Sequence, residues 1–312
     1  MKTELESICE AIRPASEERM RAARVHLDHI AKPLKALGRL EDVLVRLAGM
    51  AELRRDYRKC AVVMCADNGI VAEGVTQTGS DVTAVVAGNI LRGKASVCCM
   101  AGVAGAEVLA VDIGMLADVP GVRSCKVAYG TKNFRRGPAM TKEEAQTAVM
   151  HGVNIARELA QKGFSMLSAG EMGIGNTTSS SAVASALLRR APAEMTGRGA
   201  GLSSLQLQNK IRVIEDALAC NAPDPNDPLD VLSKVGGFDI AGMCGLFLGG
   251  ALSGIPVVID GLISSVSALL AKRLCPACAD YMIASHLSAE PAAASVTAEL
   301  GLVPLLDIGM AL

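Results

Sequence analysis

Residues 170–188 hold the densest group of side chains able to do chemistry, in the sequence GEMGIGNTTSSSAVASALL. Gly173 and Gly175 permit a backbone path that a Cβ atom would block. The Asn-Thr-Thr run at 176–178 supplies polar side chains that we expect to cap a helix running through 182–188. Free N–H groups at a helix start favour an anion such as phosphate. Because short glycine motifs are unspecific, the competing interpretation is a turn that binds nothing.

A second glycine cluster, TGRGAGL at residues 196–202, precedes a predicted helix that contains Lys210. A lysine ammonium in this position could meet a phosphate as a point charge. Taken alone, Lys210 is more simply interpreted as a solvated surface lysine.

Two further motifs are interpreted as structural. SHLSAEP at residues 285–291 opens a predicted helix in which Ser288 takes the N-cap position. His286 stands alone, and a lone histidine is more often structural than catalytic. Cys275 and Cys278 have CxxC spacing, but no second CxxC and no nearby histidine supply the other ligands of a zinc site. We therefore expect no metal here.

The elements that position these residues are visible from residue 60 onward, where short apolar runs alternate with helix-length segments. The runs are residues 61–66, 108–111, 165–169, 256–259 and 281–284. They show no polar alternation, which is typical of strands buried on both faces of a parallel sheet. Polar or glycine residues follow each run, and in open α/β sheets that carboxyl edge binds the ligand. The sequence therefore predicts an α/β fold with its site at this edge.

The N-terminal part, residues 4–54, is predicted to be helical. Leu37, Leu40, Leu44 and Leu47 recur at three- and four-residue spacing, which predicts one apolar stripe. Charged residues fill the opposite face.

The composition argues against several classes of protein. The chain has 312 residues, a formal net charge of −1, 50% hydrophobic residues and 2% aromatic residues. This length allows one large core and a small second lobe. Near-neutral charge and few aromatics argue against nucleic acid as a partner. Most of the 10 cysteines lie in apolar runs and the N-terminus has no apolar signal core, so we expect free thiols and a cytoplasmic location.

One uncharged stretch, Ala241 to Ile259, approaches the length of a transmembrane helix. It is interrupted by five glycines and by Pro256. We predict a buried helix, a turn and a buried strand here, and no association with a membrane.

As a set, the motifs resemble one family, the nicotinate-nucleotide–dimethylbenzimidazole phosphoribosyltransferases. The resemblance spans nearly the whole chain. Each motif is weak alone, but their order and spacing together are specific. They are KP at 32–33, LGRLE at 37–41, ADNGIVAEGV at 66–75, GTKNF at 130–134, PAMT at 138–141, GEMGIGNTT at 170–178, GRG at 197–199, VGG at 235–237, DG at 260–261 and SHLSAEP at 285–291.

The resemblance implies two domains. Residues 56–299 would form a large α/β domain with a Rossmann-like parallel sheet flanked by helices. Residues 1–55 would form a small helical lobe together with the extreme C-terminus, about residues 300–312. The family also implies a dimer, either of identical chains or with a homologous subunit, in which the partner helps to shape each site.

The implied reaction displaces nicotinate from the ribose C1 of nicotinate mononucleotide by an incoming base, giving an α-linked ribotide for cobamide assembly. The leaving ring is already a cationic pyridinium, so its departure needs no general acid, and a carboxylate can stabilise the oxocarbenium-like sugar. By resemblance Glu171 is that carboxylate, and neither metal nor cofactor is required. The residues expected to hold phosphate and ribose are Gly173, Ile174, Gly175, Asn176, Thr177, Lys210 and Ser288.

The sequence departs from the family pattern in two places. A Glu that usually follows the PLLD segment, and serves as base for the incoming azole, has no counterpart after residues 304–310. The expected base pocket, formed by Ala72, Thr76 and Ser80, carries a small hydroxyl where the family tends to have a large amide. Bases other than dimethylbenzimidazole, such as phenol or p-cresol, are therefore compatible with this loop.

Two functions from different classes remain open at this point. The leading one is an active phosphoribosyltransferase. The alternative is a catalytically silent homologous subunit that stabilises an active partner, which the absent Glu favours. A generic nucleotide-binding regulator would account for the glycine loops alone and leave the other motifs unexplained.

Overall fold

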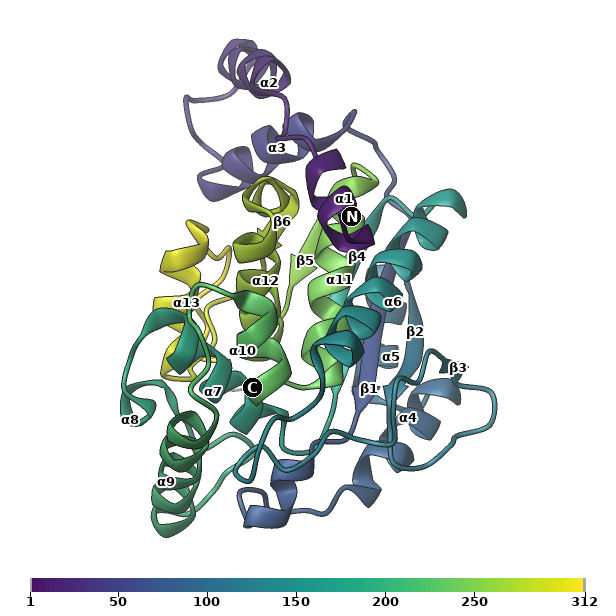
Figure 1. Cartoon of the computed structure of the whole chain (residues 1–312). Coiled ribbons are helices and arrows are strands. Elements are labelled where there is room, and N and C mark those ends of the chain that lie inside the picture. The colour runs from purple at the N-terminus through teal and green to yellow at the C-terminus, as the bar shows by residue number, and fades with distance from the viewer. Residues whose placement is uncertain (1, 311–312) are drawn as a thin grey trace.

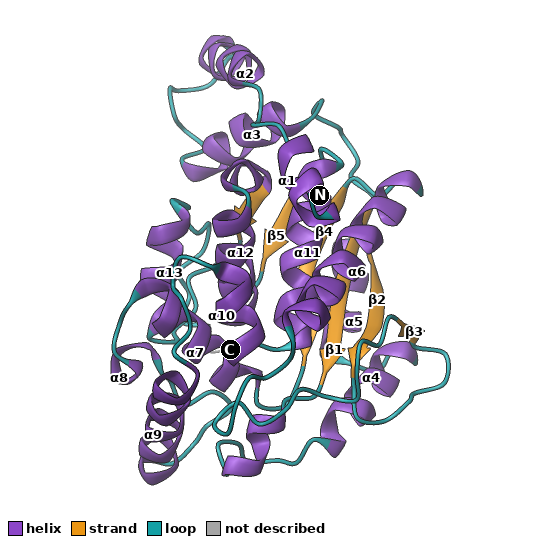
Figure 2. Ribbon diagram, in the orientation of Figure 1, coloured by secondary structure: helices purple, strands orange, loops and turns teal. Residues whose placement is uncertain are grey.

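Six parallel strands form one sheet through the centre of the molecule, in the order β3-β2-β1-β4-β5-β6 (Figures 1 and 2). This computed structural model describes residues 2–310; residues 311 and 312, with which the predicted small lobe ends, lie outside the described part. Five strands were predicted from apolar runs, whereas β3 is too short to give such a signal. The strands are β1 Lys59–Ala66, β2 Ala106–Gly114, β3 Arg123–Ser124, β4 Met166–Met172, β5 Val257–Ile259 and β6 Met282–Ala284.

Helices cover both faces of the sheet, which confirms the predicted α/β fold (Figure 2). On one face α6 and α11 pack over Val62 and Met64; on the other, α4 and α5 cover Val63 and Cys65. The helices of this part are α4 Asp81–Leu91, α5 Ser96–Ala104, α6 Lys142–Gln161, α7 Asn176–Leu188, α8 Pro192–Met195, α9 Ser204–Asn221, α10 Pro228–Val235, α11 Phe238–Leu252, α12 Gly261–Leu274 and α13 Ala292–Leu300, with short 3₁₀ helices η1 Gly69–Glu73 and η2 Pro276–Tyr281.

The chain reverses its direction of travel across the sheet between β1 and β4. From β1 it moves outward through β2 to β3, and then returns to the other side of β1 to add β4, β5 and β6. Glu171 in β4 lies in register with Met64 in β1, so both strands end at the same edge. Such a reversal opens a crevice at the carboxyl ends of the strands, where ligands bind in this class of fold.

Glycines allow α6 and α11 to pack with their backbones in contact. A Cβ atom at Gly245 would overlap the carbonyl oxygen of Val149, and one at Gly152 would overlap that of Gly242. No side chain can move aside to relieve such a clash, because the obstacle on each helix is backbone.

Replacing Gly245 with Ala is therefore expected to lower the free energy of unfolding by about 3 kcal/mol, the upper part of the range for overpacked cores. Urea unfolding followed by circular dichroism measures this change. Gly102→Ala is the matched control, because Gly102 is helical and exposed and no atom lies within 4 Å of an added Cβ. Equal urea midpoints for the two variants would refute the backbone contact.

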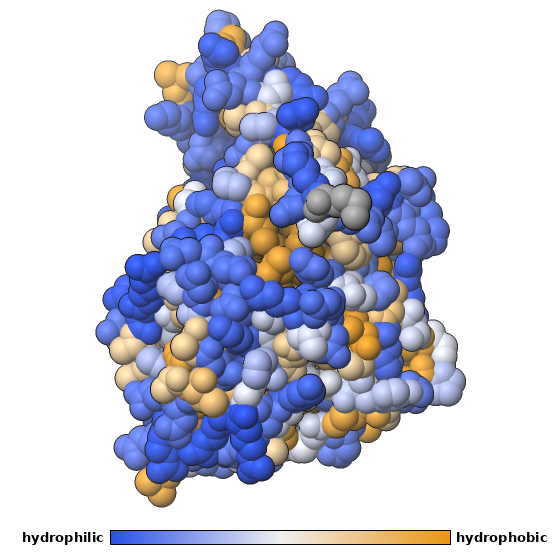
Figure 3. All heavy atoms as spheres, in the orientation of Figure 1, coloured by the Kyte–Doolittle hydropathy of each residue, from blue (hydrophilic) through white to orange (hydrophobic). Residues whose placement is uncertain are grey.

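The N-terminal helices are α1 Glu4–Ala11, α2 Glu17–His29 and α3 Arg39–Met50. Figure 1 shows α2 and α3 forming a tip above the body, while α1 lies against α11. In Figure 3 the tip is largely hydrophilic, and hydrophobic residues gather below it. The predicted leucine stripe is wrong at its start: Leu37 precedes α3 and is 47% exposed, and Leu40 is 56% exposed. The stripe reaches the body only toward the end of α3, where Leu47 is buried.

The last described residues run beside the sheet edge. Leu305 donates from its N–H to the carbonyl of Ala284 at 3.1 Å, and Leu287 donates to that of Leu306 at 2.9 Å. The Arg39 side chain in α3 reaches the carbonyl of Pro304 at 2.9 Å. The division into a domain of residues 56–299 and a lobe of residues 1–55 with about 300–312 stays a prediction.

The uncharged stretch forms a helix, a turn and a strand, as predicted. α11 ends at Leu252 and β5 begins at Val257. Among the described residues, no helix combines the length and apolar character that crossing a bilayer requires.

Candidate functional site

A cavity of about 230 Å³ opens at the carboxyl edge where β4 ends. It brings together Glu171, the whole run 173–177, Lys210 and Thr76, which come from three separate stretches of sequence. Its lining residues are Val75, Thr76, Gln77, Thr78, Glu171, Met172, Gly173, Ile174, Gly175, Asn176, Thr177, Arg198, Ala200, Leu202, Lys210 and Ile263. The individual roles expected for these residues stay predictions.

The turn from β4 into α7 requires glycine at two positions. Gly175 has φ +93°, and a Cβ atom there would lie 2.9 Å from Cγ2 of Val71. A Cβ atom at Gly173 would lie 2.7 Å from an Asp239 carboxylate oxygen. Gly175 itself is the N-cap of α7, so the prediction that residues 176–178 cap the helix with their side chains is wrong. The left-handed glycine ends the loop one residue earlier and turns Asn176 into the first helical residue.

Asn176 is thereby free to hold two carboxylates. Its side-chain amide nitrogen donates to Glu171 and, at 2.9 Å, to Oδ2 of Asp239. Oδ1 of Asp239 accepts the N–H of Ile240 at 3.0 Å. Asn176 therefore fixes the direction of the Glu171 side chain at the wall of the cavity, with Asp239 as a second anchor behind it.

Burial and mutual repulsion make both carboxyl groups weaker acids. Burial, followed by the negative charge of Asp239, raises the pKa of Glu171 to about 8. Burial also raises the pKa of Asp239 to about 6. Because one amide nitrogen links the two groups, they titrate as a pair. Near neutral pH the pair therefore holds close to one proton, and a cation in the cavity would favour its release.

Lys210 in α9 points into the same cavity and is only 1% exposed. Its ammonium donates to Oγ1 of Thr177 at 2.9 Å and to the carbonyl of Gly197 at 3.3 Å. Burial lowers the pKa of Lys210 to about 8, against the opposing effect of the Glu290 carboxylate. No carboxylate of residues 2–310 forms an ion pair with this buried ammonium, which lies beside the start of α7 and is therefore suited to receive an anion.

Three predicted site residues lie outside this lining: Ala72 in η1, Ser80 before α4, and Ser288. The Ser288 hydroxyl accepts the N–H of Glu290 at 3.3 Å. Its predicted N-cap position is wrong, because α13 begins at Ala292 with Pro291 before it. The expected contacts of all three with a substrate stay predictions.

Sequence reasoning missed a second cavity, of about 260 Å³, on the α4 and α5 face of the sheet. Glu171 and Met172 line both cavities, so Glu171 stands between them. The second lining is mainly apolar: Val63, Val86, Ile90, Ala95, Ser96, Val97, Ala169, Gly170, Glu171, Met172 and Asp260. The spacing of Val86 and Ile90 on one face of a helix was the available signal, but it indicates a core face as readily as a pocket.

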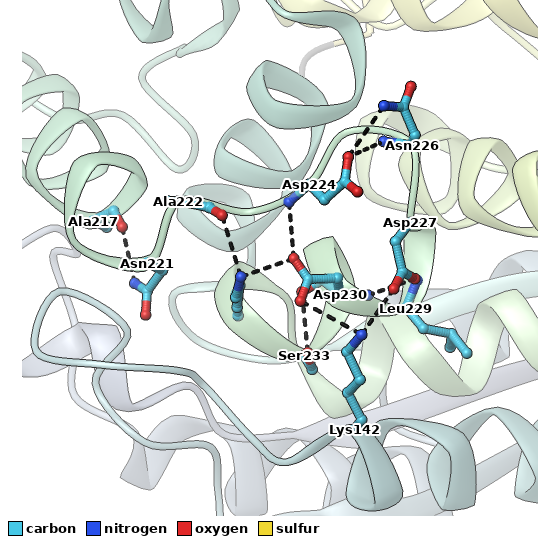
Figure 4. Close-up of polar contacts among 11 residues, drawn as sticks. Lys142, Ala217, Asn221, Ala222, Asp224, Asn226, Asp227, Leu229, Asp230 and Ser233 are labelled. Carbon is cyan, nitrogen blue, oxygen red and sulfur yellow. Dashed lines mark hydrogen bonds and ion pairs between the residues drawn. The ribbon is translucent and has the colours of Figure 1, made fainter.

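A larger cavity, of about 570 Å³, lies between the loop at residues 132–142 and α10, and two of its three lysines are already paired. Lys142 contacts Asp227 at 2.8 Å (Figure 4). Lys234 contacts Asp230 at 2.9 Å. Figure 4 shows Asp230 at the centre of a network that ties α6, α10 and the preceding loop together. These charges hold structure, which leaves the cavity at β4 as the better site. Within residues 2–310, no three His, Cys, Asp or Glu side chains are grouped so as to hold a metal ion.

Known proteins share this fold and much of this sequence. A family model described as a phosphoribosyltransferase matches residues 12–312. The nicotinate-nucleotide–dimethylbenzimidazole phosphoribosyltransferase of Acetivibrio thermocellus is 45% identical over 298 residues, covering 94% of this chain and 85% of that protein. The enzyme of the same name from Desulforudis audaxviator is 46% identical over 309 residues, covering 97% and 87%. The crystal structure of the Thermus thermophilus protein of that name superposes with a TM-score of 0.89 at 38% identity, covering 95% of this chain and 90% of that one.

Proposed function

The chain belongs to the nicotinate-nucleotide–dimethylbenzimidazole phosphoribosyltransferase family, and from this premise we propose that it transfers the phosphoribosyl group of nicotinate mononucleotide to an aromatic lower-ligand base. The products are nicotinate and an α-linked ribotide for assembly of a cobamide nucleotide loop. The names of its relatives support the reaction, and the site supports the roles given below.

One observation carries the proposal: Glu171 stands between two cavities, one of which also contains Lys210 and the start of α7, while the other has largely aliphatic walls. The first cavity offers Lys210 and the start of α7 to a phosphate. The apolar cavity offers aliphatic walls to an aromatic ring. A ribose held between them would have its C1 beside the Glu171 carboxylate, with the phosphate on one side and the incoming base on the other.

The reaction then needs little acid–base chemistry for the leaving group. The C1–N bond to nicotinate breaks with both electrons passing to the ring nitrogen, which loses its positive charge. Positive charge develops on the ribose, and the ionised Glu171 stabilises it more strongly in the transition state than in the ground state. The incoming base attacks C1 from the face opposite nicotinate, which inverts the configuration to α, and its proton passes to water.

The pKa values of Glu171 and Lys210 predict an unusual pH profile. Transfer requires Glu171 ionised and Lys210 charged, and both pKa values are about 8. Below pH 8 the Glu171 carboxyl is protonated, and above pH 8 the Lys210 ammonium is neutral. We expect kcat/KM for nicotinate mononucleotide to peak near pH 8 and to fall on both sides. In the complex, the cationic ring favours the Glu171 carboxylate and the phosphate favours the Lys210 ammonium, so the profile of kcat should be broader.

Asp239→Asn supplies the matched test of this profile. Removing the negative charge of Asp239 should lower the pKa of Glu171 and move the acidic limb of kcat/KM to lower pH, leaving the basic limb in place. A profile of kcat/KM that is flat between pH 6 and pH 9 in the wild-type chain would contradict the assigned roles.

The base is of benzimidazole or phenol type. The cavity with aliphatic walls supports a flat, mostly hydrophobic acceptor. The loop at residues 75–78 lines the neighbouring cavity that contains Lys210, beside Met172. Phenol and p-cresol would attack through oxygen, whereas dimethylbenzimidazole attacks through nitrogen. We further propose that the chain acts in the cytoplasm as a dimer, with itself or with a homologous subunit; its 10 cysteines are free, which fits a reducing compartment.

Release of nicotinate tests the function directly. The purified chain is incubated with nicotinate mononucleotide and, in separate reactions, dimethylbenzimidazole, phenol or p-cresol, and nicotinate is measured by chromatography. Base-dependent release by this chain alone is the expected result. Release that needs a homologous partner, and survives Glu171→Gln in this chain, would identify the silent subunit. No release under either condition would overturn both functions.

A further inference from the structure

Four cysteines gather where the N-terminal helix meets the body, away from the two cavities. Cys9 comes from α1, Cys244 from α11, and Cys275 and Cys278 from the turn that begins η2. In Figure 1, α1 lies against α11 on this side of the molecule. The proposed phosphoribosyl transfer uses none of these residues.

Cys9 and Cys275 are in direct contact. Sγ of Cys275 lies 3.4 Å from the carbonyl oxygen of Cys9, across 266 positions of sequence. The N–H of Ala15 donates to the Asp280 carboxylate at 3.0 Å, which holds the end of the N-terminal segment on the same turn. These two contacts hold Cys9 and Cys275 next to each other.

The contact divides the proton unequally between the two thiols. The hydrogen bond from Cys9 is the main cause that lowers the pKa of Cys275 to about 7. The same bond, followed by burial, raises the pKa of Cys9. Burial raises the pKa of both Cys244 and Cys278. Near neutral pH a share of Cys275 is therefore thiolate, the form that reacts with an oxidant, while Cys9, Cys244 and Cys278 stay protonated.

We propose that Cys9 and Cys275 form a site of reversible oxidation that takes hydrogen peroxide and closes a disulfide between α1 and η2. The Cys275 thiolate attacks one peroxide oxygen, the O–O bond breaks, and hydroxide leaves, which gives a sulfenic acid. The Cys9 sulfur then attacks the Cys275 sulfur, the S–O bond breaks, and the hydroxyl leaves as water with the Cys9 proton. The two sulfurs lose two electrons, peroxide gains them, and a dithiol reverses the step.

Burial explains why a small oxidant is required. Cys275 is 5% exposed and Cys9 is half-buried, so peroxide can reach the pair more readily than a bulky disulfide can. Once formed, the disulfide would link α1 to the body of the protein. It would also lower the conformational entropy of the unfolded chain, which stabilises the folded state. We expect oxidation to raise the melting temperature by several degrees and a dithiol to restore the original value.

The test uses the full chain with its two exposed cysteines, Cys99 and Cys220, replaced by Ser to prevent links between molecules. Peroxide is added, remaining thiols are blocked, and peptides are mapped by mass spectrometry with and without dithiothreitol. The expected product is one cross-linked peptide pair joining Cys9 to Cys275, with the loss of two hydrogens. Cys9→Ser in the same background should lose both the link and the rise in melting temperature.

Other outcomes overturn the proposal. A Cys275–Cys278 link would show that the CxxC pair reacts instead, and an unlinked protein with oxidised Cys275 would show that Cys9 cannot resolve the sulfenic acid. Absence of any change at Cys275 would show that peroxide does not reach it. Should Cys9→Ser fail to fold, the peptide map of its parent decides the question alone.

Discussion

Replacing Glu171 with Gln is expected to lower kcat for nicotinate release by about 10²–10³-fold while KM for nicotinate mononucleotide changes little. Gln keeps an oxygen that can accept the hydrogen bond from Asn176, so the side chain stays in place. What disappears is the negative charge that we propose to lie beside the ribose carbon. A loss confined to kcat means that the carboxylate acts mainly in the transition state, where positive charge on the sugar is largest.

A matched control separates this effect from a general loss of acidic charge. Glu194 in α8 is exposed and pairs with Arg190 across one turn, so Glu194→Gln should leave kcat and KM as in the wild-type chain. Steady-state kinetics with dimethylbenzimidazole at pH 8, and again at pH 9, measures all three proteins. If Glu171→Gln kept more than a tenth of the wild-type kcat, another group would have to stabilise the sugar.

The fold was readable from the sequence because its strands are buried on both faces. Uninterrupted apolar runs such as residues 61–66 leave little alternative to a central parallel strand, and the polar residues after them had to meet at one edge. The N-terminal leucines were less informative. Leu40 has the spacing of a buried stripe, but spacing cannot show that its side chain lies at the tip of the molecule, where 56% of it is exposed.

The site was only partly readable, because its decisive contacts join distant segments. The glycines at 173 and 175 indicated a tight turn. In the structure, however, Gly175 is the N-cap, and the Asn176 side chain donates a hydrogen bond to Asp239, which is 63 positions away. No local pattern marks that pairing. The apolar cavity was missed for a related reason: it forms between α4, α5 and the sheet, and each wall reads as ordinary core.

Replacing Lys210 with Met is expected to lower kcat/KM for nicotinate mononucleotide by about 10²-fold or more, because a buried ammonium paired with a phosphate is worth several kcal/mol. The same change should stabilise the unliganded protein at pH 7 by up to about 3 kcal/mol, since burial lowers the pKa of Lys210 from 10.5 to about 8. Loss of the hydrogen bonds to Thr177 and Gly197 reduces that gain.

The stabilisation expected for Lys210→Met should decrease as the pH rises. The folded state binds the Lys210 proton less tightly than the unfolded state, so the cost of burying the charge is fully present below pH 8. That cost shrinks as the pH rises from about 8 and vanishes above the unfolded value of 10.5. Urea unfolding at pH 7 and pH 10 should therefore show the advantage of Lys210→Met decreasing with pH. Lys162→Met, at the exposed C-cap residue of α6, should show neither the kinetic loss nor the pH-dependent gain. If Lys210→Met were less stable than the wild-type chain at pH 7, the buried lysine would serve the structure and not the binding of an anion.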